Sequence, residues 1–459
     1  MTQRNSSGYS DVLIGLQFGD EGKAKIVDML AKDYDIVARF NGGSNAGHTI
    51  ESGGKRLALR QVPSGVSYPN KSLYIGSGVV VNLVKLKKEI ETLEAEGFSV
   101  RDRLHLSSQA AFLQPYHTKS ESHFSESVGT TNNGIGPAYA GKALRTKGEG
   151  WLHLRLCDLV ADKELCVEMM MRNDQAFGLT QDGYTELLEA FEYVSSCIES
   201  DLNYLVKRVR TGDTVLFEGA QSYMLDVARG TVPFVTSSHT GASAAYVGGD
   251  LPPCFHRKTF GIAKAIMSRV GPGPFHSEIG GEEAAKYALE GGGSVNTREI
   301  ELSTYNPYEL LSSTNELELA ISLRMLSGEY GTVTGRPRRM GVLDLVQLRD
   351  ACLANGVDEL YLTKCDLLTH FETTKFGGIP LITDYNQNGA PLHSSLHGTV
   401  KTTPQVLPGF VKDISHVKSA SDLPSELCAL LSEIEQATEC SVTGVGVGPD
   451  RTQMVHLGR

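Results

Sequence analysis

The sequence predicts an α/β fold with a large, mainly parallel central sheet flanked by helices. Two observations support this prediction. Short apolar runs of strand length alternate along the chain with longer stretches whose apolar residues recur at helical spacing, as in strand–helix–strand units. Several apolar runs end in glycine-rich turns, and the chain has 49 glycines in 459 residues. Because ligands bind at the carboxyl ends of parallel strands, these turns are the first places to look for a site.

The expected elements follow in chain order. The apolar run 12–14 predicts a buried strand, and residues 26–30 predict the first turns of the helix after it. Residues 82–96 predict an amphipathic helix, because Asn82 is a suitable N-cap and Gly97 lies just past its end. Further helices are expected at 158–172 and 185–209, and further strands at 35–40, 214–217 and 359–363.

Residues 10–459 are expected to form a single domain, since no internal repeat and no clear linker interrupts them. Residues 1–9 are expected to be a disordered tail. The stretch 280–330 mixes helical patterns with glycine-rich loops and is the expected place of an insertion.

Composition and charge exclude several functional classes. The net charge of −11 argues against a general binder of nucleic acid or of membrane surfaces. No apolar run reaches about 18 residues, so no membrane span is expected. The N-terminus is polar and lacks the apolar core of a signal peptide. The eight cysteines are far apart and form no CxxC pair, which indicates thiols in a reducing cytoplasm.

The glycine-rich segment 15–25, with the sequence GLQFGDEGKAK, is the most informative part of the chain. It lies between a predicted strand and a predicted helix, so backbone N–H groups and the helix N-terminus can hold a phosphate, with Lys23 adding a charge. This pattern predicts a P-loop-NTPase-like nucleotide-binding core. Ala24 follows the lysine and cannot ligate Mg²⁺, so Asp20 is the candidate ligand. The alternative is a glycine-rich turn with scattered charges.

Two further clusters follow predicted strands or turns. In residues 41–49, His48 could be a general acid or an electrophile and Asn45 a polar anchor, although a lone histidine is more often structural. Residues 129–139, followed by Lys142 and Arg145, combine hydroxyls, backbone N–H groups and cations that suit a monophosphate. A surface loop with a basic tail is the alternative for the second cluster.

Clusters in the middle of the chain suggest base and anion recognition. Gln221, at the end of a predicted strand, can bind a polar base edge, and Thr236 can bond a phosphate; a buried strand end with a polar turn is the alternative. The arginines of residues 334–339 offer forked donors for a carboxylate or a phosphate, and a solvated basic turn is the alternative.

Residues 362–366, with the sequence LTKCD, follow the pattern by which GTP-binding proteins recognise guanine. In that pattern the aspartate accepts hydrogen bonds from the base and the lysine stem packs on the ring. Residues 446–451 form a second tight turn that could enclose the base. Together with the phosphate loop, these residues favour GTP over ATP.

Taken in chain order, these motifs resemble those of the adenylosuccinate synthetase family, the GTP-dependent ligases that join IMP to L-aspartate. The matches extend from about Val12 to Arg451 and include GDEGK, NAGHT, FEGAQ, PFVTSS, TGRPRR and GPDR. The resemblance implies formation of adenylosuccinate, GDP and phosphate through a 6-phosphoryl-IMP intermediate, in AMP biosynthesis. It also implies Mg²⁺ as cofactor and a homodimer in which Arg145 reaches the partner's IMP.

The resemblance also implies a role for individual residues. Asp20 would be the general base and, with the Gly47 carbonyl, a metal ligand, while His48 would be the general acid; Lys23 and Gln221 complete the catalytic set. The implied GTP-binding residues are Gly19, Glu21, Gly22, Lys23, Ala24, Gly47, His48, Thr49, Arg338, Lys364, Asp366, Gly446, Gly448 and Pro449. Those implied for IMP are Asp20, Asn45, Thr131, Arg145, Gln221, Thr236 and Arg336, and those implied for aspartate are Thr332, Thr334, Arg336 and Arg338.

The chain departs from the family pattern at several positions, among them Ala24, Asn132, Asn133, Ser222 and Val333. These departures leave two alternatives open. One is a paralogue that acts on a modified or deoxy purine nucleotide or uses another amino donor. The other is a GTP-binding protein without ligase activity.

Overall fold

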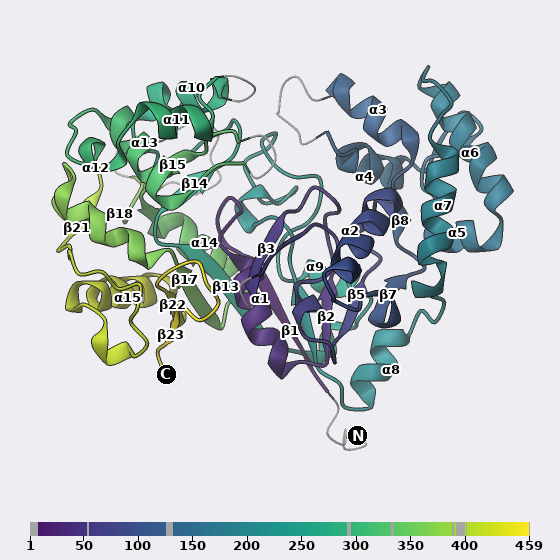
Figure 1. Cartoon of the computed structure of the whole chain (residues 1–459), viewed down its shortest axis with the longest axis horizontal. Coiled ribbons are helices and arrows are strands. Elements are labelled where there is room, and N and C mark those ends of the chain that lie inside the picture. The colour runs from purple at the N-terminus through teal and green to yellow at the C-terminus, as the bar shows by residue number, and fades with distance from the viewer. Residues whose placement is uncertain are drawn as a thin grey trace. The chain divides into compact units, whose positions relative to one another are not determined.

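The computed structural model describes residues 8–52, 55–124, 132–291, 295–331, 335–387, 390–391, 400 and 402–458 (Figure 1). The chain divides into two compact units, and each is described on its own. Unit 1 comprises Met1–Ile14, Lys23–Gln221 and Thr236–Lys258, and unit 2 comprises Gly15–Gly22, Ser222–Val235 and Thr259–Arg459.

Unit 1 is built on a parallel sheet. Its strands lie in the order β11 (Ile198–Glu199), β7 (Leu104–Ser107), β5 (Ser72–Ile75), β2 (Ile36–Arg39), β12 (Val215–Glu218) and β1 (Ser10–Gly15). Each neighbouring pair in this order is parallel. The central strands are wholly buried, as expected of a parallel sheet with both faces covered. The strands predicted at 12–14, 35–40 and 214–217 are confirmed.

The helices of unit 1 follow these strands along the chain. They are α1 (Lys23–Leu30), α2 (Leu83–Ala95), α3 (Pro115–Phe124), α4 (Ile135–Leu144), α5 (Leu156–Ala161), α6 (Lys163–Ala176), α7 (Tyr184–Val194), α8 (Tyr204–Arg210) and α9 (Ala244–Gly248). Helix α2 confirms its predicted cap, since the Asn82 side chain accepts a hydrogen bond from the Lys85 N–H at 3.0 Å. Shorter strands complete the unit: β3 (His48–Ser52), β4 (Lys55–Leu59), β6 (Val80–Val81), β8 (Ala111–Phe112), β9 (Thr146–Lys147) and β10 (Gly150–Trp151).

Two predicted helices of unit 1 were wrong in extent. The helix expected at 158–172 is broken between α5 and α6 by Asp162, whose side chain accepts a hydrogen bond from the Leu165 N–H at 2.9 Å and caps the second helix. The helix expected at 185–209 ends with α7, and β11 and α8 follow. The apolar residues near Ile198 extend the sheet, so their helical spacing was misleading.

Unit 2 contains a second set of sheet strands, in the order β13 (His256–Lys264), β17 (Glu359–Thr363), β22 (Ser441–Gly446) and β23 (Met454–His456). The first three are parallel to one another and β23 is antiparallel to β22. Strand β17 confirms the predicted strand 359–363. Both units therefore have the mainly parallel α/β architecture that the sequence predicts.

The segment predicted as an insertion contains α10 (Gly281–Glu290), α11 (Arg298–Thr304), α12 (Pro307–Leu310) and α13 (Glu316–Ser327). These helices cluster together in the upper part of unit 2 in Figure 1. Helices α14 (Leu345–Asn355) and α15 (Ser425–Thr438) pack against each other. The remaining strands are β14 (Met267–Arg269), β15 (Arg339–Gly341), β16 (Leu343–Asp344), β18 (Ile379–Ile382), β19 (Asn386–Gln387), β20 (Ala390–Pro391) and β21 (Gln405–Leu407).

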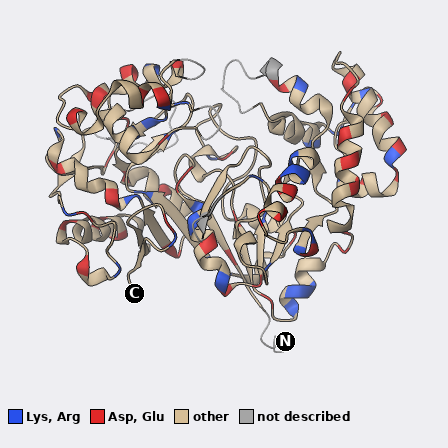
Figure 2. Cartoon of the chain, in the orientation of Figure 1, with Lys and Arg blue, Asp and Glu red and all other residues tan. Residues whose placement is uncertain are grey.

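Acidic and basic side chains are interspersed over the helices of both units (Figure 2). In the part of the chain that the structure describes, no helix has the length and apolar character needed to cross a membrane. All eight cysteines are free thiols.

Candidate functional site

Residues 15–22 of the predicted phosphate loop belong to unit 2, and the glutamate of this segment fixes its shape. Gly19 and Gly22 have positive φ angles of 96° and 84°, a conformation that glycine adopts without strain, and Asp20 between them has a φ of 57°, which aspartate adopts more readily than most residues. The buried Glu21 carboxylate accepts hydrogen bonds from the Gly19 N–H at 2.9 Å and from the Ser222 hydroxyl at 2.7 Å. Glu21 therefore organises the loop from inside, so its predicted contact with GTP would come from its backbone.

Asp20 lies at the exposed rim of this loop. Its side chain is 39% exposed and forms an ion pair with Arg338, whose Nη2 is 2.7 Å from Asp20 Oδ2. Arg338 is itself buried and also donates from Nη1 to Glu329 at 2.5 Å. The structure thus brings the predicted general base together with Arg338, one of the arginines predicted to bind aspartate.

Glu329 also contacts the predicted guanine-binding lysine. Lys364, which follows β17 with a φ of 59°, donates to Glu329 Oε1, and the buried Lys264 Nζ is 3.6 Å from the same oxygen. Burial alone would raise the pKa of Glu329, but the charges of Lys264, Lys364 and Arg338 hold that pKa well below its usual value. One ionised carboxylate therefore joins three cations.

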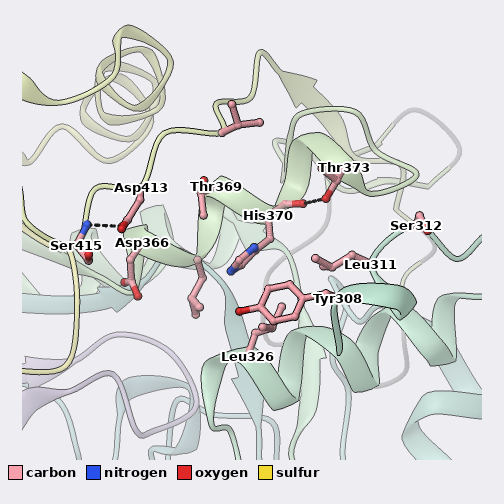
Figure 3. A pocket seen from close by; sticks show the side chains of 12 residues that line it. Tyr308, Leu311, Ser312, Leu326, Asp366, Thr369, His370, Thr373, Asp413 and Ser415 are labelled. Carbon is pink, nitrogen blue, oxygen red and sulfur yellow. Dashed lines mark hydrogen bonds between the residues drawn. The ribbon is translucent and has the colours of Figure 1, made fainter. Parts of the chain in front are cut away.

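One predicted base-binding residue, Asp366, lines a cavity of about 640 Å³ in unit 2 (Figure 3). Asp366 lies beside Asp413 and Ser415 in this view, and the rings of Tyr308 and His370 lie close to each other farther along the cavity. Gly446 ends β22 where a Cβ would lie only 3.1 Å from the Thr363 Cα, so close approach of β17 requires glycine there. Gly448 and the exposed Pro449 follow in the next turn.

In unit 1, the predicted general acid has a buried acidic partner. His48 Nδ1 is hydrogen-bonded to Glu218 Oε1, and Glu218 also accepts from the Ser64 N–H at 2.8 Å and the Ser64 hydroxyl at 2.5 Å. Burial lowers the pKa of His48, whereas the charge of Glu218 opposes that effect. Burial raises the pKa of Glu218, but His48, Arg39 and Ser64 outweigh it and lower the value to about 2. An Nδ1–H donated to the ionised Glu218 leaves Nε2 of His48 for a ligand.

The loop before His48 is fixed to the end of β12. The Asn41 amide donates to the carbonyls of Ala220 at 3.1 Å and His239 at 3.0 Å, and its oxygen accepts from the Ala220 N–H at 2.8 Å. Gln221 follows with a φ of 56°, and a Cβ on Gly42 would meet its amide oxygen at 3.0 Å. This arrangement joins three segments of unit 1 that the sequence predicts to bind IMP.

Some polar atoms of this region have no hydrogen-bond partner within the described residues. They include Ser44 Oγ, Asn45 Oδ1 and Ser238 Oγ, and the Nε and Nη2 atoms of the fully buried Arg39. Buried polar atoms usually have partners, so such atoms mark places where a polar ligand or water would bind. Asn45 was predicted to contact IMP, and Thr236 lies two residues before Ser238.

The other predicted residues have varied surroundings. Lys23 and Ala24 are buried at the start of α1, Thr49 is half-buried at the start of β3, and Gly47 is exposed. Arg336 is exposed and donates to the Gly291 carbonyl at 2.8 Å. Arg145 is exposed at the end of α4. Thr131, Thr332 and Thr334 lie outside the described residues, as does Val333.

Sequence reasoning missed three residues that contact predicted site residues. Glu218 lies within the quoted FEGAQ motif but was not assigned a role, and its position at the end of a buried strand was the available signal. Lys264 likewise follows the apolar end of β13, and Glu329 lies between α13 and the arginine-rich turn. A charged residue in such a context is buried only when it is paired, and the partner cannot be deduced from one chain alone.

Comparison with known proteins assigns the family. The model of the adenylosuccinate synthetase family matches residues 12–455. The chain is 44% identical to adenylosuccinate synthetase 2 of Cupriavidus pinatubonensis, with 99% of this chain and 98% of that protein covered. It is 36% identical to adenylosuccinate synthetase of Carboxydothermus hydrogenoformans, with 97% and 98% covered.

Solved structures agree with this assignment. The fully ligated adenylosuccinate synthetase of Plasmodium falciparum matches with a TM-score of 0.81 and 29% identity, over 98% of this chain and all of that one. A succinoaminodeoxyadenylate synthetase of cyanophage S-2L, bound to dGMP and dATP, matches with a TM-score of 0.58 and 19% identity, over 98% and 95%. The second likeness shows a shared fold alone.

Proposed function

The chain belongs to the adenylosuccinate synthetase family, which ligates IMP and aspartate with GTP in AMP biosynthesis, and we propose that it catalyses this reaction. The observation that supports the proposal most strongly is the extent of the family match, from residue 12 to residue 455. The geometry of Asp20 and of the His48–Glu218 pair then suggests how the chemistry is divided among residues.

In the first step, the Asp20 carboxylate takes the N1 proton of IMP. The O6 atom then forms a bond to the γ-phosphorus of GTP, and the bond from that phosphorus to the β,γ-bridging oxygen breaks, which gives GDP and 6-phosphoryl-IMP. The carboxylate suits this role because its side chain is 39% exposed and is therefore open to a bound substrate.

His48 serves the same step as a donor from Nε2 to the oxygens that gain charge. Its Nδ1 is occupied by Glu218, which fixes the ring orientation and stabilises an imidazolium if one forms. In the second step the amine of aspartate forms a bond to C6, phosphate leaves with the O6 atom, and the amine loses a proton. Phosphorylation is needed because a carbonyl oxygen is a poor leaving group.

We also propose that Mg²⁺ assists the reaction. The residue types suit this ion, because Asp20 carries a carboxylate and Gly47 a backbone carbonyl, both hard oxygen ligands, and both residues are exposed. Among the described residues, no three His, Cys, Asp or Glu side chains cluster as a metal site. When bound, the ion would neutralise charge on the phosphates.

The binding roles are assigned within each unit. In unit 1, Asn45, Gln221 and Thr236 would hold IMP, because their segments are joined around Asn41. In unit 2, Lys364 and Asp366 would bind guanine, and Arg338 would bind the carboxylate of aspartate. Lys23 would contact phosphate, and Thr131, Thr334 and Arg336 keep their predicted roles toward IMP and aspartate.

A homodimer in the cytoplasm completes the proposal. Arg145 is exposed and follows the exposed Leu144, whose side chain is 62% accessible, so this end of α4 has both an apolar contact and a cation to offer a second copy. The free thiols are compatible with a reducing compartment. Mixing inactive Arg145→Ala and Asp20→Asn chains tests the dimer, because hybrid dimers would regain one functional site.

The proposed reaction is tested by following adenylosuccinate absorbance with purified protein, GTP, Mg²⁺, IMP and L-aspartate. We expect a rise that requires both GTP and aspartate. Parallel reactions contain dIMP or dGMP in place of IMP. Turnover with only one of these replacements would identify a paralogue with another purine substrate. No phosphate release with any of the three nucleotides would refute the proposal that the protein is a ligase.

A further inference from the structure

Glu329 connects two residues to which the proposed function gives different substrates. Its Oε1 accepts from Lys364, assigned to guanine, and its Oε2 accepts from Arg338 at 2.5 Å, assigned to aspartate. The carboxylate is 1% exposed, so solvent does not weaken these contacts. Two cations for two substrates are therefore held by one side chain.

The contacts of Glu329 leave it little freedom to move. Oε2 also accepts from the Ser268 hydroxyl at 2.7 Å, and that hydroxyl accepts from the buried Lys264 Nζ. The Lys264 backbone is fixed in turn by Gln17 of the phosphate loop, whose side chain accepts from the Lys264 N–H at 2.9 Å and donates to its carbonyl at 3.0 Å. The carboxylate is thus anchored to β13 and, through Gln17, to the loop that carries Asp20.

A purely structural role of Glu329 would not explain why its partners are Lys364 and Arg338, two residues assigned to substrates. Buried ion clusters contribute little net stability compared with apolar residues of the same size. The Lys364 side chain is 28% exposed, and its ammonium group is held by Glu329 and by the Ser327 carbonyl at 2.9 Å. Arg338 uses Nη1 for Glu329 and Nη2 for Asp20, so the position of Glu329 also sets the direction of the group that contacts the general base.

We propose that Glu329 is a positioning residue that sets Lys364 for the purine base of GTP and Arg338 for the substrate carboxylate, and so couples the two binding events. This inference rests on the proposed function. Glu329 touches no substrate itself. Its removal should therefore weaken GTP and aspartate together and affect IMP much less, because the two ligand residues that Glu329 binds, Lys364 and Arg338, are assigned to GTP and aspartate.

The variant Glu329→Gln tests this, with Glu278→Gln as the matched control. Glu278 is also buried in unit 2, and its carboxylate accepts from Arg339 at 2.7 and 2.6 Å without contacting an assigned ligand residue. We expect Glu329→Gln to raise KM for GTP and for aspartate by about tenfold each, the effect of one charge-assisted hydrogen bond, and KM for IMP by less than about twofold. The control Glu278→Gln should change Tm without raising KM for GTP and aspartate together.

Two further measurements isolate the coupling. In a Lys364→Met background, Glu329→Gln should raise KM for aspartate as before but leave KM for GTP nearly unchanged, because the lysine is already absent. If Glu329→Gln does not fold, Glu329→Asp replaces it, and smaller rises in the same two KM values are expected. Unchanged KM values, equal rises for all three substrates, or the same pattern in Glu278→Gln would overturn the proposal.

Direct binding of a fluorescent GTP analogue separates this proposal from the proposed function. If the wild type makes no adenylosuccinate, the ligase assignment fails, but the analogue still measures whether Glu329→Gln weakens nucleotide binding. Weaker binding by about tenfold would support the Lys364 part of the proposal in that case, and equal binding would refute it.

Discussion

His48 in unit 1 and Asp20 in unit 2 are assigned to proton transfer, yet their surroundings are opposite. His48 is 7% exposed, and its partner Glu218 is completely buried and further fixed by Ser64. Asp20 is 39% exposed and is bound by Arg338, which the substrate carboxylate is also proposed to bind. The His48–Glu218 pair is preformed, whereas Asp20 is paired with an arginine that is also proposed to bind substrate.

This difference indicates where binding can change reactivity. The contact of His48 with Glu218 is formed within the chain itself and Glu218 is held by Ser64, so the proposed donor of unit 1 has a fixed orientation. Asp20 is paired with Arg338 through Oδ2, and a carboxylate substrate on Arg338 would compete with Asp20 for that guanidinium. Ligand binding should therefore matter more for Asp20 than for His48.

The largest expected effect is at Asp20. Asp20→Asn keeps the shape but removes the base, so kcat should fall by about 1,000-fold while GTP binding stays within a few-fold. Phosphate release and adenylosuccinate absorbance measure the first quantity, and equilibrium binding of GTP the second. Exposed Asp384 provides the control, since Asp384→Asn should leave both unchanged. Substantial turnover by Asp20→Asn would show that Asp20 is not the general base.

The next effect is at the partner of His48. Glu218→Gln keeps a hydrogen-bond acceptor but loses the charge that favours the donor tautomer at Nδ1, so kcat should fall by about 100-fold with little change in KM. Steady-state kinetics with each substrate varied in turn measure this split. A higher KM for IMP with an unchanged kcat would show that Glu218 supports substrate binding. The His48–Glu218 pair would then have no role in the chemical step.

The same carboxylate predicts a pH dependence of stability. Its pKa is lowered from 4.5 to about 2 in the folded chain, so its stabilisation is complete above pH 4.5 and is lost as the pH falls toward 2. The difference in Tm between the wild type and Glu218→Gln should therefore be largest near neutral pH and shrink below pH 4.5. Thermal unfolding at several pH values measures it, and a constant difference would contradict the ionised pair.

The sequence predicted the secondary structure around His48 and Asp20 but not the side-chain ion pairs of these two regions. The strand before the phosphate loop, strand β17 and the Asn82 cap were predictable because apolar runs and cap residues act locally. The partners Glu218 of His48 and Glu329 of Lys364 are 170 and 35 residues away in the chain. Such pairings depend on tertiary packing, which no local pattern encodes. Overextension of the helix at 185–209 has the same origin, since tertiary contacts turned its apolar residues into strand β11.

The smallest effect concerns how the phosphate loop of unit 2 is held. The Ser222 hydroxyl donates to Glu21, and a Cβ at Gly15 would lie 2.2 Å from that hydroxyl, so the three residues are tightly packed. Ser222→Ala removes one buried hydrogen bond of about 1 kcal/mol, which should raise KM for GTP by about fivefold while kcat stays near wild type.

Ser322→Ala is the matched control, because its buried hydroxyl donates to the Pro307 carbonyl at 2.7 Å and contacts no loop residue. A rise in KM for GTP confined to Ser222→Ala would show that the loop depends on Glu21 being fixed by a second segment and not on glycine geometry alone. Equal behaviour of the two serines would mean that the glycines suffice. Asp20 would then be presented by a loop as preformed as the His48–Glu218 pair, and only its ion pair with Arg338 would distinguish the two regions.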